Sequence, residues 1–204
     1  MKRIIIFLCA SCFVDAALAQ EINKQAAATE TETVKSLNKS TMDNQSFTTT
    51  IVLDLSPHEV FKAITNVSGW WSEEIEGATE KVNDEFNYHY EDIHRAKMRL
   101  IEVIPNKKVV WLVLDNQFKF TKDKNEWKGN KIVFEISEKG KKTQLQFTQL
   151  GLVPEYECYD VCKEGWTNYI QNSLRGLITT GKGQPNATGK PRTETEKKLA
   201  SSHQ

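Results

Sequence analysis

The feature that most constrains the fold is a long amphipathic segment near the end of the chain, preceded by a run of strand-like segments. Between about residues 158 and 180, apolar residues recur every three or four positions, which predicts one buried face of a single long helix. Gly181 and Gly183 follow it, as expected just past a helix end. The apolar positions are Val161, Cys162, Gly165, Trp166, Tyr169, Ile170, Leu174, Leu177 and Ile178.

The segments before this helix alternate between apolar and polar residues, which is typical of half-buried strands. Short turns separate them, so consecutive strands should pair antiparallel. One face of the resulting sheet must be covered, and only the long helix has the length to cover it. Strands are expected near residues 48–55, 86–90, 97–104, 109–114, 132–136 and 145–147, and residues 122–130 should form a long hairpin loop.

Two short helices are expected after the first strand. Ser56, Pro57 and Glu59 supply a cap, a first helical residue and a capping box, which together predict a helix start. The turn at residues 69–72, which contains Trp70 and Trp71, begins the second. We therefore predict an α+β fold, in which a curved antiparallel sheet of about six to seven strands surrounds one long C-terminal helix.

The start of the chain has the layout of an export signal. Lys2 and Arg3 precede an apolar run at residues 4–14, and a small-residue cleavage pattern ends at Ala19. Residues 1–19 are thus expected to be a signal peptide and the protein to be periplasmic or secreted. If translation starts at Met42 instead, the protein would be cytoplasmic.

The remaining chain divides by composition. Residues 20–45 are rich in small and polar residues and should be a disordered linker, residues 46–185 the folded domain, and residues 186–204 a disordered tail. The apolar run at residues 4–14 is too short to span a bilayer, so no integral membrane segment is expected after signal removal. The 27 basic and 27 acidic residues balance, which argues against a nucleic-acid partner.

Several motifs in this order resemble the START-like (SRPBCC, helix-grip) domains, in the branch named after the activator of heat-shock protein 90 ATPase homologue. The resemblance covers about residues 46–185. It implies a hydrophobic cavity between the sheet and the long helix, and therefore a small hydrophobic molecule as partner, but no single activity. The matching residues are the helix start at 56–61, the turn at 69–72, Trp111 in its strand, Gly165 and Trp166, and the helix end at 177–185.

Aromatic side chains are the candidate lining of that cavity, because they combine a large apolar area with, in Tyr and Trp, a polar tip. Ordinary core packing is the alternative for each of them. No nucleophile motif or phosphate-binding loop is present, so no catalytic residue and no cofactor are predicted. The candidate ligand-binding residues are Trp71, Phe86, Tyr88, Tyr90, Trp111, Trp127, Trp166 and Tyr169.

Three hypotheses about function remain. The first is an exported domain that binds a small hydrophobic ligand, the second a cyclase or hydrolase that uses the same cavity, and the third a protein-interaction module related to the chaperone activators. A histidine or carboxylate that points into the cavity would favour the enzyme.

Two small groups allow a metal or a disulfide. Cys158 and Cys162 are compatible with a disulfide in an exported protein, but two buried thiols at a helix start fit their spacing better. His89, Asp92 and His94 form a polar group that suggests a metal, yet no fourth ligand lies nearby in sequence. A solvated turn is the preferred interpretation of this group, so no metal site is predicted.

Overall fold

The computed structural model describes residues 46–187 and 190–202. Contacts divide the chain into two units, and all described residues belong to the second. The predicted signal peptide and linker lie outside the described residues. The elements are β1 (Phe47–Leu53), α2 (Pro57–Thr65), η1 (Val67–Gly69), β2 (Glu76–Gly77), β3 (Glu85–Tyr90), β4 (His94–Ile104), β5 (Lys108–Phe118), β6 (Lys131–Lys139), β7 (Lys142–Leu150), α3 (Tyr159–Asn168), η2 (Tyr169–Leu174), α4 (Arg175–Thr180) and α5 (Glu194–Ser202).

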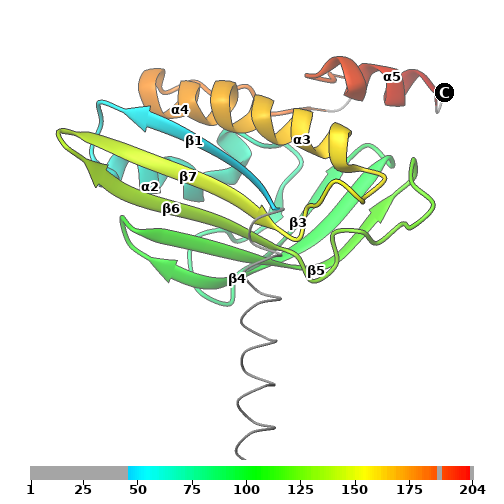
Figure 1. Ribbon diagram of the computed structural model, residues 1–204, viewed down its shortest axis with the longest axis horizontal. Coiled ribbons are helices and arrows are strands. Elements are labelled where there is room, and N and C mark those ends of the chain that lie inside the picture. Colours follow the sequence, from blue (N-terminus) through cyan, green and yellow to red (C-terminus); the bar gives the residue numbers. More distant parts are fainter. Residues whose placement is uncertain (1–45, 188–189, 203–204) are drawn as a thin grey trace, which may run out of the picture. The chain divides into compact units, whose positions relative to one another are not determined.

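The described strands form one antiparallel sheet of seven strands in the order β1-β7-β6-β5-β4-β3-β2. Only the β1–β7 pairing joins strands distant in sequence, and it places the first strand beside the last. The sheet is curved, and the helical segment from α3 to α4 crosses its concave face (Figure 1). The predicted α+β architecture is therefore confirmed.

The long C-terminal helix is continuous from Tyr159 to Thr180, but its middle is not α-helical. Residues Tyr169–Leu174 form a π-helical segment, η2, between α3 and α4. We refer to α3, η2 and α4 together as the rod. It ends at Gly181, whose φ of 74° is the left-handed conformation that favours glycine at a helix end.

The start of α2 follows the prediction from its sequence. The Ser56 side chain accepts a hydrogen bond from the Glu59 backbone N–H, and the Glu59 carboxylate accepts one from the Ser56 N–H. This capping box satisfies two of the backbone donors that a helix start leaves free. η1 follows α2 and leads directly into Trp70 and Trp71.

Hydrogen bonds to α2 and to the rod hold this tryptophan turn in place. The Trp70 indole N–H donates to the Ile64 carbonyl at 3.3 Å, and the Ser173 hydroxyl of η2 donates to the Trp70 carbonyl at 2.6 Å. The chain after the rod also passes the turn closely: a Cβ on Gly183 would lie 2.0 Å from the Gly69 carbonyl oxygen. Only glycine fits at position 183.

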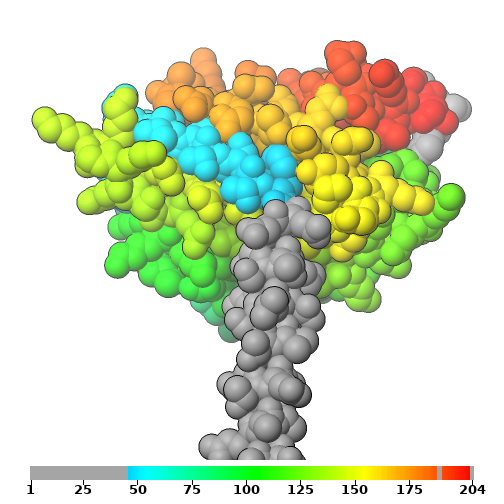
Figure 2. Space-filling view, viewed as in Figure 1, coloured from blue at the N-terminus to red at the C-terminus, as the bar shows by residue number. Residues whose placement is uncertain are grey.

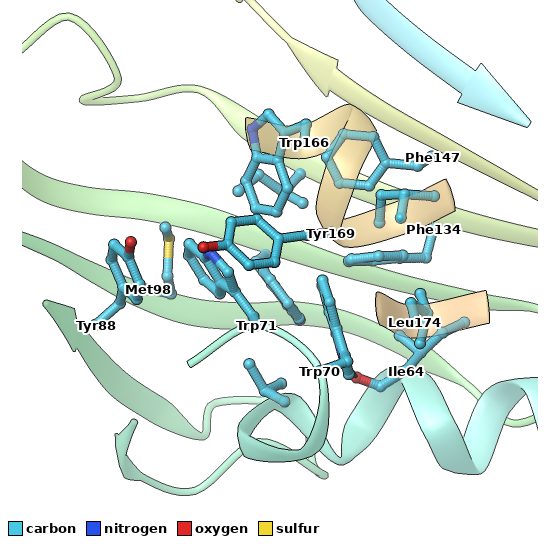
Figure 3. Packing of buried hydrophobic residues seen from close by; sticks show 14 of the residues in the cluster. Ile64, Trp70, Trp71, Tyr88, Met98, Phe134, Phe147, Trp166, Tyr169 and Leu174 are labelled. Carbon is cyan, nitrogen blue, oxygen red and sulfur yellow. Dashed lines mark hydrogen bonds between the residues drawn. The ribbon is translucent and has the colours of Figure 1, made fainter. Parts of the chain in front are cut away.

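Five aromatic residues of the interior are fully buried and pack against one another, and we call them the packed cluster. Their ring centroids lie 4.9–5.9 Å apart in the pairs Trp111–Phe134, Phe86–Trp111, Phe134–Phe147 and Trp70–Phe134, and each side chain is at most 1 % exposed. Figure 3 shows Trp70 and Phe134 close to Leu174 of the rod. The members of the packed cluster are Trp70, Phe86, Trp111, Phe134 and Phe147.

The segment after residue 185 differs from the predicted disordered tail. Asn186 is fully buried, and its backbone bonds to Trp71 and Glu73 in a parallel bridge. Residues Glu194–Ser202 form the helix α5, which lies against α3 (Figure 2). α5 is mostly charged and polar, so its composition resembles that of a disordered segment. Among the described residues, no helix is both long and apolar enough to cross a membrane.

Candidate functional site

A cavity of about 60 Å³ lies between the concave face of the sheet, the rod and α5. Its walls come from the turn after η1, from strands β3 to β5, from the β5–β6 loop, from α3 and η2, and from Glu196 and Leu199 of α5. Six of the eight predicted ligand-binding residues line it, namely Trp71, Tyr88, Tyr90, Trp127, Trp166 and Tyr169.

The other two predicted residues, Phe86 and Trp111, do not line the cavity. They belong to the packed cluster, where the ring of Phe86 meets that of Trp111 edge to face at 5.1 Å. Trp71 and Trp166 lie at the border between the two regions, with ring centroids 5.0 Å apart. The aromatic interior therefore has one filled part and one part that contains the cavity.

Gly165 faces the cavity from the middle of α3. A Cβ built at this position would meet no atom within 4 Å, and its backbone is ordinary helix. Glycine in a helix interior is about 1 kcal/mol less favourable than alanine. No steric requirement for glycine exists at this half-buried position, so the residue lowers helix stability without relieving a clash.

The β5–β6 loop places Trp127 over the cavity. Asn116 of β5 holds this loop, because its side chain accepts from the Trp127 backbone N–H at 2.9 Å and donates to the Lys124 carbonyl at 3.2 Å. The neighbouring Glu126 carboxylate accepts from the backbone N–H groups of Glu157 and Cys158 at the start of α3. One loop thus fixes both a cavity wall and the beginning of the rod.

Three polar tips around the cavity have partners within the protein. The Tyr88 hydroxyl accepts from the Asn186 side-chain amide at 3.2 Å, and the Tyr169 hydroxyl donates to the Glu196 carboxylate at 2.8 Å. The Trp166 indole N–H donates to the side chain of Gln149.

Three other polar atoms at the cavity have no such partner. Among the described residues, the Tyr90 hydroxyl, Nε2 of His94 and Nε1 of Trp127 are buried without a hydrogen bond. The Trp127 N–H does interact with the Cys162 sulfur, which is a weak acceptor.

His94 is a site residue that the sequence reasoning placed wrongly, in a solvated turn with His89 and Asp92. Part of its side chain reaches solvent, but Nε2 is buried and the ring packs on Trp127 at 4.8 Å. β4 begins at His94 rather than near residue 97, and His94 pairs directly with Tyr90 of β3. This pairing puts His94 on the same face of the sheet as Tyr90, since directly paired residues share one face. The register of the hairpin could therefore have indicated where His94 lies.

The predicted polar group is therefore divided. His89 pairs with Glu74 at 3.8 Å, and Asp92 pairs with Lys119. Within residues 46–187 and 190–202, no cluster of His, Cys, Asp or Glu suits a metal ion. Cys158 and Cys162 are free buried thiols, so the disulfide alternative is wrong.

Burial keeps the histidine, the tyrosines and the Cys162 thiol of the cavity uncharged. It lowers the pKa of His94 to about 3, and it raises the pKa of Tyr90 to about 12, with a smaller contribution from the Glu196 charge. Burial also raises the pKa values of Tyr88, Tyr169 and the Cys162 thiol. At neutral pH the cavity therefore holds a neutral imidazole and protonated tyrosines, with the Glu196 carboxyl at its edge.

Comparison with known families matches residues 54–179 to the model "Activator of Hsp90 ATPase homolog 1-like protein". The chain belongs to this family. The match begins at the end of β1 and reaches almost to the end of the rod, so it contains every strand from β2 to β7. The predicted relation to START-like domains, in their chaperone-activator branch, is thereby confirmed.

Solved structures show the same fold. The solution structure of the Aha1 dimer from Colwellia psychrerythraea is 22 % identical and has a TM-score of 0.55, with 68 % of this chain and 98 % of that chain covered. Protein MLL2253 from Mesorhizobium loti is 15 % identical with a TM-score of 0.52, and 68 % and 100 % are covered. DynU16, a putative protein of the dynemicin biosynthetic locus, is 14 % identical with a TM-score of 0.52, and 70 % and 50 % are covered.

A search of curated proteins gives no match. At these identities the solved structures carry the fold and not the activity. The family and the fold support a module that binds either a small molecule or a protein.

Proposed function

We propose that this domain binds a small hydrophobic molecule in the cavity between the sheet and the rod. The observation that carries the proposal is Gly165: a helix-interior glycine, free of any neighbour within 4 Å, faces a space walled by aromatic rings. A side chain at this position would fill the space and favour the helix. A ligand that needs the space explains why a glycine stands there.

The size of the cavity implies that α5 moves when a ligand binds. About 60 Å³ is well below the roughly 150 Å³ of an engineered apolar cavity that holds benzene. Glu196 and Leu199 of α5 form part of the wall, and α5 is a short helix with no fully buried residue. Its displacement would enlarge the cavity without disturbing the sheet or the rod.

The low pKa of His94 and the hydrogen bonds of Glu196, the two groups at the cavity that could serve as a general base, favour binding over catalysis. A general base works best with a pKa near the working pH, whereas the pKa of His94 lies at about 3. The Glu196 carboxylate already accepts hydrogen bonds from the Tyr169 hydroxyl and from the backbone N–H groups of Arg192 and Thr193. Neither group is poised to take a proton from a substrate.

An Hsp90-activator-like interaction module is the second candidate, and the family match favours it. It predicts binding to a chaperone rather than to a hydrophobic probe. Export would separate the domain from a cytoplasmic chaperone, and we propose export because of the signal-peptide layout at residues 1–19. The intact mass of the protein from its native host tests this: a chain that retains residue 1, or starts at Met42, contradicts export.

The binding proposal is tested by filling the cavity. The Gly165→Leu variant should bind a fluorescent hydrophobic probe at least about tenfold more weakly while its stability against urea stays equal or rises. The Gly165→Ala variant is the matched control, which gains helix propensity but leaves most of the space. Unchanged probe affinity in a folded Gly165→Leu protein would exclude the cavity as the binding site. Native mass spectrometry of the purified wild type would then identify any co-purified molecule.

A further inference from the structure

The three residues whose polar atoms lack an oxygen or nitrogen partner are neighbours in the cavity wall. Tyr90 ends β3, His94 begins β4 directly opposite it, and Trp127 lies in the β5–β6 loop with its ring perpendicular to that of His94. Tyr90 and Trp127 are each only 3 % exposed. These three side chains adjoin one another in the cavity wall, and we call this part of the wall the polar side.

Unpartnered polar atoms in such a position need an explanation, because a buried donor or acceptor without a hydrogen bond is unfavourable. The other polar tips at the cavity, those of Tyr88, Tyr169 and Trp166, all have protein partners. The Trp111 indole N–H in the packed cluster also lacks one, but it does not line the cavity. Among the described residues that line the cavity, only Tyr90, His94 and Trp127 have a buried polar side-chain atom without a hydrogen-bond partner.

The chemistry of the three atoms restricts what can satisfy them. An indole N–H only donates, a phenol hydroxyl donates or accepts, and a neutral imidazole nitrogen does one or the other according to its tautomer. The occupant must therefore offer an acceptor to Trp127. An ammonium group has donors only and does not meet this requirement.

The charges around the cavity restrict the occupant further. Among the described residues that line it, none is Lys or Arg, and the one carboxylate is that of Glu196. An anion would enter a site with no cation to pair with it and with a like charge at the edge, which is costly at low dielectric.

On the ligand-binding function proposed above, we propose that the ligand is an uncharged molecule with an apolar body and one hydroxyl or carbonyl oxygen. The oxygen lies at the polar side and accepts from the Trp127 N–H. The Tyr90 hydroxyl and Nε2 of His94 complete its hydrogen bonds. The apolar body lies between the aromatic walls formed by Trp71, Trp166 and Tyr169.

Four probes with one common body test this: 2-naphthol, 2-naphthoate, 2-naphthylmethylammonium and 2-methylnaphthalene, titrated into the full domain by tryptophan fluorescence. We expect 2-naphthol to bind about tenfold more tightly than 2-methylnaphthalene, in keeping with one to two net hydrogen bonds. Both charged probes should bind more weakly than 2-methylnaphthalene. The tightest binding by naphthoate or by the ammonium probe would overturn the proposed ligand class.

The Tyr90→Phe variant locates the effect. It keeps the ring and removes the hydroxyl, so it should reduce the preference for 2-naphthol over 2-methylnaphthalene several-fold and leave 2-methylnaphthalene binding unchanged. Tyr159→Phe, on α3 but outside the cavity wall, is the matched control and should change neither.

The possible failures are distinguishable. If 2-naphthol and 2-methylnaphthalene bind equally well, water satisfies the polar side and the inference about the ligand is wrong, while ligand binding itself stands. If no probe binds at all, the proposed function fails first and this inference fails with it.

Discussion

The packed cluster and the cavity lie under the same rod and on the same face of the same sheet, yet one is filled and the other is not. In the packed cluster, Phe134 lies against Trp70, Trp111 and Phe147, and none of these four residues has exposed surface. Around the cavity, the wall includes tyrosines, Trp127 and His94, which carry polar tips.

The residues that the rod presents reinforce this difference. Toward the packed cluster the rod presents Leu174, which is fully buried and lies near Trp70 in Figure 3. Toward the cavity it presents Gly165 among the larger side chains of Cys162, Trp166 and Tyr169. Aromatic content alone therefore does not make a binding pocket. A pocket forms where polar-tipped rings face a helix position that lacks a side chain.

The contrast between the packed cluster and the cavity is wrong if replacing a tryptophan by alanine lowers the free energy of unfolding equally in both regions. We expect Trp111→Ala to lower the free energy of unfolding by about 4 kcal/mol, because it leaves a new void among tightly packed rings. Trp127→Ala should cost about 2 kcal/mol, because one side of that ring already faces empty space and its loop can relax. Urea unfolding monitored by far-ultraviolet circular dichroism measures both. Equal losses would mean that the cavity wall is as tightly packed as the rest of the core.

A second effect concerns His94 and acid. The unfolded chain binds a proton at this residue near pH 6.5, whereas the folded chain does so only near pH 3. Its contribution to stability is therefore complete above pH 6.5 and decreases as the pH falls toward 3, by up to about 1.4 kcal/mol per pH unit. The difference in unfolding free energy between pH 7 and pH 5 should reach about 2 kcal/mol.

The His94→Phe variant cannot titrate at this position and should lose most of that pH dependence. His58→Gln, at an exposed histidine on α2, is the control and should retain it. If wild type and His94→Phe respond equally to acid, Nε2 of His94 is not shielded in the folded protein.

The two regions also differ in how far the sequence predicts them. Local sequence patterns predicted β1 and β3 to β7, the capping box and the rod, because these depend on residues close together in the chain. They also placed Phe86, Tyr88 and Tyr90 correctly on one face of β3. They could not tell that Phe86 lies in the packed cluster while the two tyrosines reach the cavity, since that depends on where the rod crosses the strand.

His94 and α5 were missed for related reasons. His94 is positioned by the register of the β3–β4 hairpin, whose turn includes Glu91 at a φ of 48° and contains no glycine to mark it. α5 is a short charged helix, and its position follows from contacts of Glu196 and Thr195 with residues 27 and 31 positions earlier. Composition alone carries no sign of such contacts.

A third effect tests α5 as the movable wall. Removing residues 191–204 should cost only about 1 kcal/mol of stability, because α5 buries little apolar surface. The same truncation should tighten binding of a hydrophobic probe by about fivefold, since the ligand no longer has to displace α5. Weaker binding after truncation would show that α5 belongs to the site and does not merely cover it.

The smallest expected effect concerns a single hydrogen bond that holds α5 to the rod. Tyr169→Phe removes the donor to the Glu196 carboxylate but keeps the ring in the cavity wall. Because water can replace the lost partner of this half-buried carboxylate, we expect a stability loss below about 1 kcal/mol. Probe affinity should rise about twofold, in the same direction as after removal of α5.

Thr195→Val, which removes the hydrogen bond from α5 to Glu164, should raise probe affinity in the same way, and Tyr159→Phe should have no effect on it. If Tyr169→Phe instead weakens binding as much as a cavity-filling substitution does, the Tyr169 hydroxyl contacts the ligand directly. Its role would then be to bind the ligand and not to hold α5 over the cavity.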